Sequence, residues 1–595
     1  SAAIREAMGE MAADFPKGLD YAIVYDPTQF IDKSVDAVIQ TLFEAVLLVV
    51  LVMIIFLQSW RAALIPVLAI PVSLIGTFAV MHAFGYSINN LTLFGLVLAI
   101  GIVVDDAIVV VENIERNLES GLSPREATRK SMSEVSGAII ATSLVLLAVF
   151  VPTAFLSGIS GQFYRQFALT IATSTIISTL ISLTLSPALG VLLLRQKSAK
   201  QDSLTRILNF FLGWFFRLFN RLFDKVNQGY TAIVKRTLRL GFVMLLLYAG
   251  LLAIAGFGFK IVPGGFIPPQ DQGYAIVAAQ LPTGSSLDTT DATLQKLIKL
   301  VGDVEGVEDV VSFAGFNGAT FSNATNSIVL FPVFKDFSER DRGPEIYQRL
   351  TKAIRQVDAF GIVIPPPTVR GLGNGGGFKM EIQDRVGLGY AALEQATWGL
   401  AFAAGAEKEI GQAFTPFTSS GPQYYADINR EKALMLGVPL ENLFQTLEVY
   451  LGSSFVNELN LYGRTYRVTA QADSQFRDGV EDIAKLKTRN SAGKMVPLGS
   501  VMELRQRTGP DRVVRHNLYP AADLIGAAAP GLSSGQAIAK MEELAEKVLP
   551  PGISYEWTDL AYQETENSGG AVMIFLVAVL FVFLLLTAQY ESWGL

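Results

Sequence analysis

Two adjacent carboxylates, Asp105 and Asp106, interrupt an otherwise apolar stretch of the sequence, Leu91–Val111. The stretch is 21 residues long, about enough for one helical crossing of a bilayer. The pair lies roughly 6 Å past its midpoint, at a rise of about 1.5 Å per residue. An ionised acid at that depth costs on the order of several kcal/mol. The pair therefore needs groups that protonate it, pair with it or hydrate it, and the chemistry it could perform is the binding and release of protons.

The surroundings of the pair indicate how it could be accommodated. On a helix the two side chains point about 100° apart, so they face two adjacent interfaces. Glu112 lies seven residues after Asp105 on the same face, and the apolar segments carry no Lys or Arg in their cores. Hydroxyl partners are abundant in Ala168–Leu194. We favour proton carriage over a purely structural role, in which the acids would lock helices together or face a wet interface.

The composition predicts the membrane helices that would position this pair. Charged residues make up 17% of the 595 residues, below the roughly 25% of soluble domains. Apolar residues concentrate in seven candidate spans: Val38–Leu57, Ala62–Phe84, Leu91–Val111, Ile139–Leu156, Ala168–Leu194, Phe242–Phe259 and Ala571–Ala588.

Positive charge predicts the orientation of these spans. The connections 116–135 and 195–206 are rich in Arg and Lys, whereas Gly85–Asn90 has no charge. We expect the basic connections to be cytoplasmic, and residues 1–35 and 261–568 to lie on the opposite side. In Ser203–Tyr230, basic residues punctuate an aromatic pattern. This predicts an amphipathic helix in the interface rather than an eighth crossing.

The soluble block alternates strand-like and helix-like segments. Tyr274–Val369 follows the order β-α-β-β-α-β, which predicts a ferredoxin-like unit. After the glycine-rich break Gly371–Gly377, a second unit begins. We expect Pro422–Asn429 to be one of its strands. An insertion is expected at roughly 438–511, and the unit should resume with Val513–Gly526.

An internal repeat relates the first and last spans. The separation from Asp to Trp is 34 residues in both copies, from Asp26 to Trp60 and from Asp559 to Trp593. Both copies run from a soluble segment into the membrane in the same direction, which is a parallel repeat of the kind found in transporters. Because five spans follow the first copy, we expect five more after the second, including a cation that would answer the Asp pair.

Several classes of function are disfavoured. A net charge of −7 without a basic, aromatic patch argues against a nucleic-acid partner. With no Cys and two His, the sequence offers neither disulfides nor a metal cluster. No nucleophile motif or phosphate-binding P-loop is present. We therefore expect a transporter driven by a proton gradient, not an enzyme, and no cofactor.

The motifs resemble those of resistance–nodulation–division (RND) efflux transporters. Gly101–Asn113 is similar to the family's fourth transmembrane helix, and the double acid favours the hydrophobe/amphiphile multidrug branch. Further matches lie along the whole sequence: Phe56–Arg61, Ala127–Ser131, Phe150–Pro152, Tyr164–Phe167, Pro269–Gly273, Glu431–Ala433, Ala528–Gly531 and Tyr590–Trp593.

The resemblance implies a fold and a domain organisation. The fold is a membrane α-helical bundle, with seven spans here of an expected twelve, plus α+β periplasmic porter subdomains with ferredoxin-like βαββαβ units. The domains expected are 1–35, the tail of an N-terminal porter domain; 36–195, five transmembrane helices; 196–240, a cytoplasmic amphipathic helix and linker; 241–260, a transmembrane helix; 261–374, a first C-terminal porter subdomain; 375–437 with 512–568, a second; 438–511, a docking-type insertion; and 569–590, a transmembrane helix.

The resemblance also implies site residues, partners and location. The proton relay maps onto Asp105 and Asp106, and the drug pocket onto the aromatic segment 311–331, with Phe313, Phe316, Phe321 and Phe331 as substrate-binding residues. Such a pump is a homotrimer in the inner membrane of a Gram-negative bacterium. It works with a periplasmic adaptor and an outer-membrane channel, and it exports drug-like amphiphiles. The alternatives are a relative that exports another substrate, such as lipid, and a non-transporting assembly scaffold.

Overall fold

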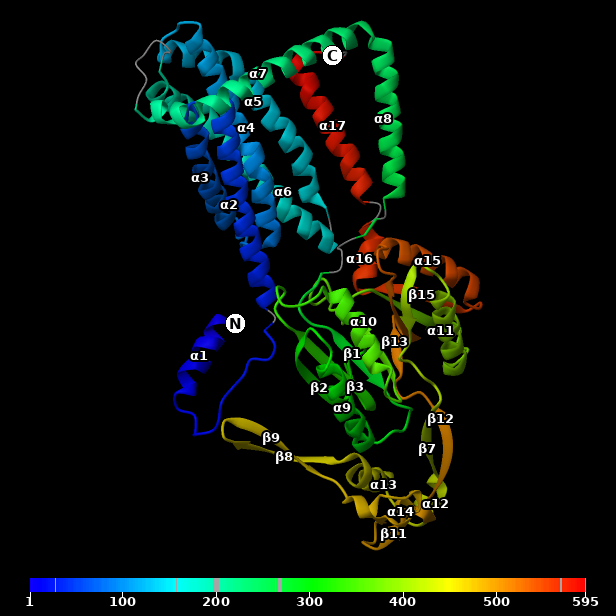
Figure 1. The fold of residues 1–595 in the computed structure, drawn as a ribbon. Helices are drawn as coiled ribbons and strands as arrows, with labels where there is room; N and C mark the ends of the chain where they lie inside the picture. Colours follow the sequence, from blue (N-terminus) through cyan, green and yellow to red (C-terminus); the bar gives the residue numbers. More distant parts are fainter. Residues whose placement is uncertain are drawn as a thin grey trace.

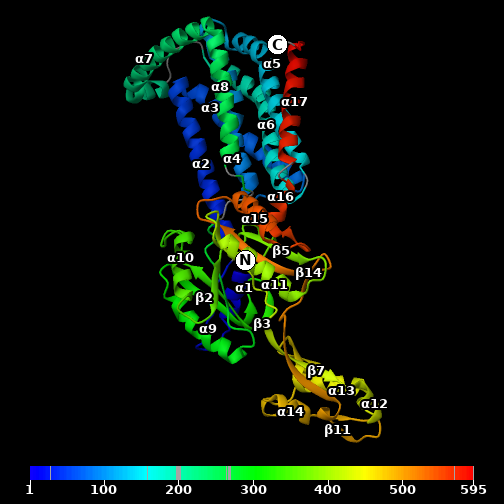
Figure 2. The ribbon, with the colours of Figure 1, turned by 90° about the vertical axis from the view of Figure 1, so that its right-hand side faces the viewer.

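The computed structural model describes residues 1–26, 28–156, 158–195, 203–262, 264–265, 270–567 and 570–593. Its helical bundle stands above two α+β units, and a smaller distal segment lies beyond them (Figures 1 and 2). Residues 196–202, part of the predicted linker, lie outside the described residues, as do Pro269 of the Pro269–Gly273 motif and residues 568–569 at a predicted domain boundary.

Seven helices are long and apolar enough to cross a membrane, which confirms the predicted spans for the described residues. They are α2 (Gln29–Leu57), α3 (Trp60–Ala83), α4 (Asn90–Glu119), α5 (Pro124–Phe150), α6 (Gly158–Leu193), α8 (Gly241–Ile261) and α17 (Gly570–Tyr590). Polar caps fix where several begin: Ser59, Asn89 and Ser123 each accept hydrogen bonds from the first-turn amides of α3, α4 and α5.

Small residues allow α4 to pack closely at the centre of the bundle. A Cβ on Gly95 of α4 would lie 3.3 Å from the Thr170 side chain of α6, and one on Gly190 of α6 would lie 2.8 Å from Ile114 of α4. Leu96, Ile100 and Ile114 of α4 are fully buried. The sequence therefore fixes α4 against α6 at both ends, and the Asp pair lies between these contacts.

A long helix, α7 (Ser203–Arg239), connects α6 to α8. It runs across the end of the bundle opposite the soluble units (Figures 1 and 2). Its Phe219 packs edge-on against Phe56 of α2 at a ring-centroid distance of 5.3 Å, and Asn220 and Gln58 exchange side-chain hydrogen bonds. The helix is longer than the predicted segment 203–230.

The first soluble unit is the predicted ferredoxin-like fold. Its strands lie in the order β2-β3-β1-β4, all pairs antiparallel, and both helices pack on one face around Leu297, Leu330 and Leu350. The elements are β1 (Ile276–Gln280), α9 (Leu287–Gly302), β2 (Val307–Asn317), β3 (Ser322–Phe334), α10 (Gly343–Ile354) and β4 (Phe360–Ile364).

The second unit repeats this arrangement in the strand order β6-β14-β5-β15, and β13 pairs with the first part of β14 on the same edge as β6. Its elements are β5 (Phe378–Asp384), α11 (Tyr390–Gly405), β6 (Ile410–Phe414), β13 (Val514–His516), β14 (Tyr519–Ala528), α15 (Ser534–Val548) and β15 (Ile553–Thr558). Residues 513–526, with which this unit was expected to resume, form a hairpin, because Asn517 and Leu518 take positive φ values and turn the chain. From β15 the chain passes through α16 (Asp559–Asn567) toward α17.

The distal segment is joined to the second unit by a two-stranded ribbon. The segment 422–429, expected in the second sheet, is instead β7 (Gly421–Ile428), which pairs antiparallel with β12 (Met502–Gly509) along its whole length. The ribbon carries α12 (Arg430–Met435), α13 (Leu440–Leu447), α14 (Val480–Lys485) and the short pair β10 (Lys487–Arg489) and β11 (Met495–Pro497). An arm of β8 (Ser454–Leu461) and β9 (Arg464–Ala470) projects sideways (Figure 1).

Candidate functional site

Helix α4 holds the two carboxylates on adjacent faces. Asp106 is 9% exposed and Asp105 is exposed, as expected for neighbouring residues on a helix. The Ser178 hydroxyl of α6 donates a hydrogen bond to Asp106 Oδ2 at 3.4 Å. The structure therefore places a hydroxyl of the predicted Ser- and Thr-rich span beside one acid.

The hydroxyls near Asp106 form a row along α6. Successive members are four residues apart and therefore lie next to one another on the helix surface, and all are at most 2% exposed: Thr170, Ser174, Ser178, Ser182 and Ser186. Asp106 thus faces a polar seam inside the bundle. Asp105, by contrast, shares an exposed strip of α4 with Phe94 and Leu98.

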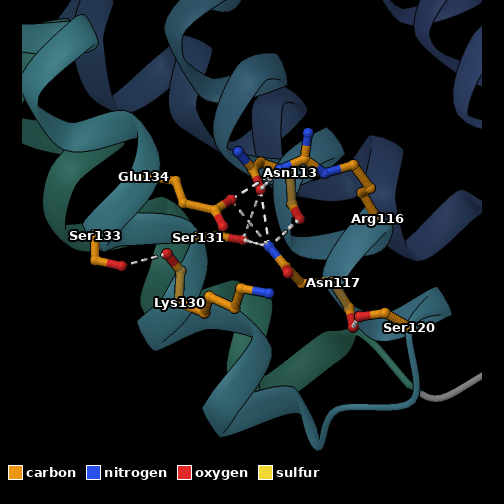
Figure 3. A network of polar contacts seen from close by, with 8 residues as sticks. All are labelled: Asn113, Arg116, Asn117, Ser120, Lys130, Ser131, Ser133 and Glu134. Carbon is orange, nitrogen blue, oxygen red and sulfur yellow. Dashed lines mark hydrogen bonds and ion pairs between the residues drawn. The ribbon is translucent and has the colours of Figure 1, made fainter.

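A polar network ties α4 to α5 about two turns beyond the Asp pair (Figure 3). The buried Asn117 amide donates to Asn113 Oδ1 at 2.9 Å and to Ser131 Oγ at 3.1 Å. Arg116 pairs with Glu134 at 2.8 Å. This network was not predicted from the sequence, although Asn113 and Asn117 at i, i+4 on one helix face were a visible signal.

The four predicted phenylalanines come together along the β2–β3 hairpin. Phe313 lies 6.4 Å from Phe316 and 6.3 Å from Phe331, and Phe316 lies 5.6 Å from Phe321, all in edge-to-face contact. Phe313 and Phe321 are each 50% exposed. Phe316 and Phe331 pack against a buried cluster that includes Phe414 of the second unit. The hairpin thus carries two solvent-exposed rings, Phe313 and Phe321, next to two packed rings, Phe316 and Phe331, beside the junction of the two units.

A pocket of about 500 Å³ opens between the two units. Its walls include Phe360 of the first unit and Trp398 and Phe417 of the second. Asp358 and Glu394 also line it, and none of the described lining residues is Lys, Arg or His. Glu394 accepts hydrogen bonds from the amide and the hydroxyl of Ser419. The resemblance implied a pocket between the two units, but the residues that line this one were not predicted, because its two walls lie far apart in the sequence, although Glu394 and Trp398 share one helix face.

The arrangement defines a class of protein: a multi-pass membrane protein with two ferredoxin-like units between its sixth and seventh described spans, and two acids within one span. The AcrB/AcrD/AcrF family model matches residues 1–595. The chain belongs to this family, and the predicted likeness to RND multidrug efflux transporters of the hydrophobe/amphiphile branch is confirmed.

Individual relatives agree with the family match. The chain is 40% identical to the multidrug export protein AcrF of Escherichia coli (strain K12) over 602 residues, which cover 100% of this chain and 57% of that protein. It is 38% identical to the toluene efflux pump membrane transporter TtgB of Pseudomonas putida, covering 100% of this chain and 56% of TtgB. The multidrug resistance protein MdtF of E. coli (strain K12) is also 38% identical, and the match covers 100% of this chain and 57% of MdtF. The chain thus spans a little over half the length of these relatives.

Proposed function

We propose that this chain provides proton-carrying and drug-binding parts of a secondary transporter that exports amphiphilic drugs in exchange for protons. The observation that carries the proposal is the placement of the two acids within a membrane span, Asp106 buried against the Ser178 hydroxyl and Asp105 exposed on the next face of the same helix. Protonation would remove the cost of a charge at this depth. The two charge states therefore favour different packing around α4.

The driving force is large enough for this role. A membrane potential supplies about 2.3 kcal/mol per charge per 100 mV, and each pH unit adds about 1.4 kcal/mol. The exposed face of α4 calls for a polar or cationic partner, since lipid cannot satisfy Asp105. We propose that this partner lies in a second half-bundle, as the Asp26–Trp60 and Asp559–Trp593 repeat predicts. We also propose that the domains of the chain have the limits predicted from the sequence.

The four-phenylalanine hairpin is the proposed drug site. Aromatic faces provide large contact areas that tolerate many orientations of an apolar ligand. We expect Phe331→Ala to lower export of several unrelated drugs by roughly tenfold, the effect of about 1.4 kcal/mol of lost binding. Drug accumulation in cells that express the transporter would measure it. Phe476→Ala, in the distal segment, is the control, and unchanged drug export with altered lipid export would favour the lipid-transporting alternative.

The pocket between the units suggests a preference for cationic amphiphiles. Its aromatic rings attract cations through their faces, and its two carboxylates have no basic neighbour among the described residues of the lining. We expect Glu394→Gln to weaken binding of tetraphenylphosphonium by about fivefold, as loss of about 1 kcal/mol of charge attraction implies. Isothermal titration on the purified chain would test this. A neutral detergent-like ligand should bind equally to the unsubstituted protein and to Glu394→Gln. The charge-matched control Glu339→Gln should leave the affinities for the cationic and the neutral ligand unchanged.

Assembly follows the same proposal. We propose a homotrimer in the inner membrane of a Gram-negative bacterium, joined to a periplasmic adaptor and an outer-membrane channel. The relatives' names as efflux pump membrane transporters support it, as does the β8–β9 arm, whose side chains are almost all exposed. A crosslink from this arm to a second copy in membranes would be the expected result.

A further inference from the structure

One face of the second unit's sheet is polar although it is buried. Along β5, Phe378, Met380 and Ile382 point into the hydrophobic core, so the alternating Lys379, Glu381 and Gln383 lie on the other face. Glu381 is 4% exposed and Gln383 is fully buried. A sheet face that is both charged and buried requires partners for its polar atoms.

Three carboxylates form a row across this face. Glu381 of β5 lies directly opposite Asp523 of β14 and, on its other side, Glu556 of β15. Like charges at directly opposed positions destabilise an antiparallel sheet. The row is therefore tolerated only if cations, or protons, neutralise its members.

The cations on this face are unevenly shared. Glu556 is paired with Arg385 at 2.7 Å and lies 3.1 Å from His516 Nε2. Asp523 is paired with Arg512 at 2.5 Å and also with Lys379 at 3.1 Å. Among the cations of the described residues, Glu381 is paired with that same Lys379 alone, at 2.9 Å from its Oε1. The carboxylate at the centre of the row thus shares its one lysine with Asp523.

The second carboxylate oxygen of Glu381 has no such partner. Among the described residues, Glu381 Oε2 is buried and accepts no hydrogen bond, and on the same face Gln383 Nε2 and Ser554 Oγ of β15 are also buried without a partner. Asp559, at the start of α16, adds a further negative charge that acts on Lys379 and Asp523. The neighbouring negative charges and the oxygen without a hydrogen-bond donor both favour the neutral form of the Glu381 carboxyl group over the ionised form.

We infer that Glu381 is a proton-binding site in the second unit, separate from the acids within the membrane span. Burial first, and then the Asp523 carboxylate, raise the pKa of Glu381 to about 7, against the opposing effect of Lys379. Asp523 remains ionised: although burial opposes it, Lys379 and Arg512 hold the pKa of this carboxyl below its ordinary value.

Protonation redistributes the contacts around β5. A neutral Glu381 leaves Lys379 to Asp523 alone and supplies a hydroxyl that can donate to a neighbouring acceptor. When Glu381 is ionised, two carboxylates compete for one lysine. Because the folded-state pKa is raised, the stabilising effect is full at pH values below the ordinary glutamate pKa and is lost as pH rises through about 7. The β5–β14 pairing is thus tighter on the acidic side of neutrality.

Infrared spectroscopy of the purified chain can detect the proton directly. We expect a carbonyl band of a protonated, buried carboxyl group that disappears as pH is raised from about 6 to about 8. The band should be missing in Glu381→Gln and retained in Glu556→Gln, its matched neighbour in the row. A spectrum without a Glu381-dependent band in this range would overturn the inference.

Hydrogen exchange on the unsubstituted chain tests the same inference without any variant, so the test does not depend on whether a variant folds. After correction for intrinsic rates, amides of β5 and β14 should exchange more slowly at about pH 6 than at about pH 8, while β1 and β3 of the first unit should not change. Equal exchange of β5 and β14 at both values would contradict the inference. Both measurements are independent of whether the membrane acids carry protons in transport.

Discussion

Cells that express the full-length transporter with Asp105→Asn or Asp106→Asn should lose proton-coupled drug export. Each substitution keeps the shape of the side chain but removes the group that changes charge. For every proton no longer carried at 100 mV, about 2.3 kcal/mol of driving force disappears, which corresponds to a drug gradient lower by roughly fiftyfold. Asn at position 106 can still accept the Ser178 hydrogen bond, so the bundle should remain folded.

The measurement is drug efflux from energised vesicles together with the accompanying proton flux. Normal amounts of protein in the membrane would separate loss of coupling from loss of folding. Asp291→Asn, an exposed acid on α9, is the control and should leave both fluxes unchanged. Retained drug-coupled proton flux in both membrane variants would contradict the relay assignment, and normal assembly without any transport in the unsubstituted protein would favour the scaffold alternative.

Removing the buried Arg340 should produce the largest loss of stability in the first soluble unit. Its side chain is 1% exposed and binds both oxygens of Asp271, at 2.8 and 2.9 Å. It also stacks on Phe337 at 4.5 Å and Phe334 at 5.2 Å. Arg340→Met would leave a partly buried carboxylate without its cation, at a cost of about 3–5 kcal/mol in the free energy of unfolding.

Denaturant unfolding followed by hydrogen exchange in residues 270–364 would measure this loss. Arg349→Met is the matched control, since Arg349 pairs with Asp341 and Glu305 at the surface and should cost under about 1 kcal/mol. Although burial opposes it, Arg340 and two backbone amides hold the pKa of Asp271 below its ordinary value. The contribution of this pair is therefore present near neutral pH and lost as pH falls through the lowered pKa; equal stability of the two variants would refute the assignment.

Features encoded locally were predictable from the sequence. Membrane helices stand out because a run of about 20 apolar residues is longer than a buried strand or an ordinary core helix requires. The first βαββαβ unit stands out because the spacing of its apolar residues alternates between the period of a strand and the period of a helix. The four phenylalanines lie within 19 residues, from 313 to 331, so one hairpin was enough to bring them together.

Features made by distant segments were not predictable in this way. The pairing of β7 with β12 joins strands separated by the whole distal segment, and no local pattern identifies such a partner. Strand β6, Ile410–Phe414, is short and contains Gly411 and Ala413, which weakens its strand signal. The acidic pocket and the Glu381 row depend on tertiary register, since a shift of one residue would turn Glu381 into the hydrophobic core.

Helix α7 has a mechanical consequence for the bundle. Its 37 residues make a rod of about 55 Å at a rise of about 1.5 Å per residue. One part is anchored on α2 through Phe56 and Gln58, and its other end leads into α8. The rod therefore keeps a fixed distance between the ends of α8 and of the group α2–α6, although the two can tilt relative to one another. Movements of the group that carries Asp105 can therefore reach α8 as a change of angle, while the lateral spacing stays set by the part of α7 that follows Asn220.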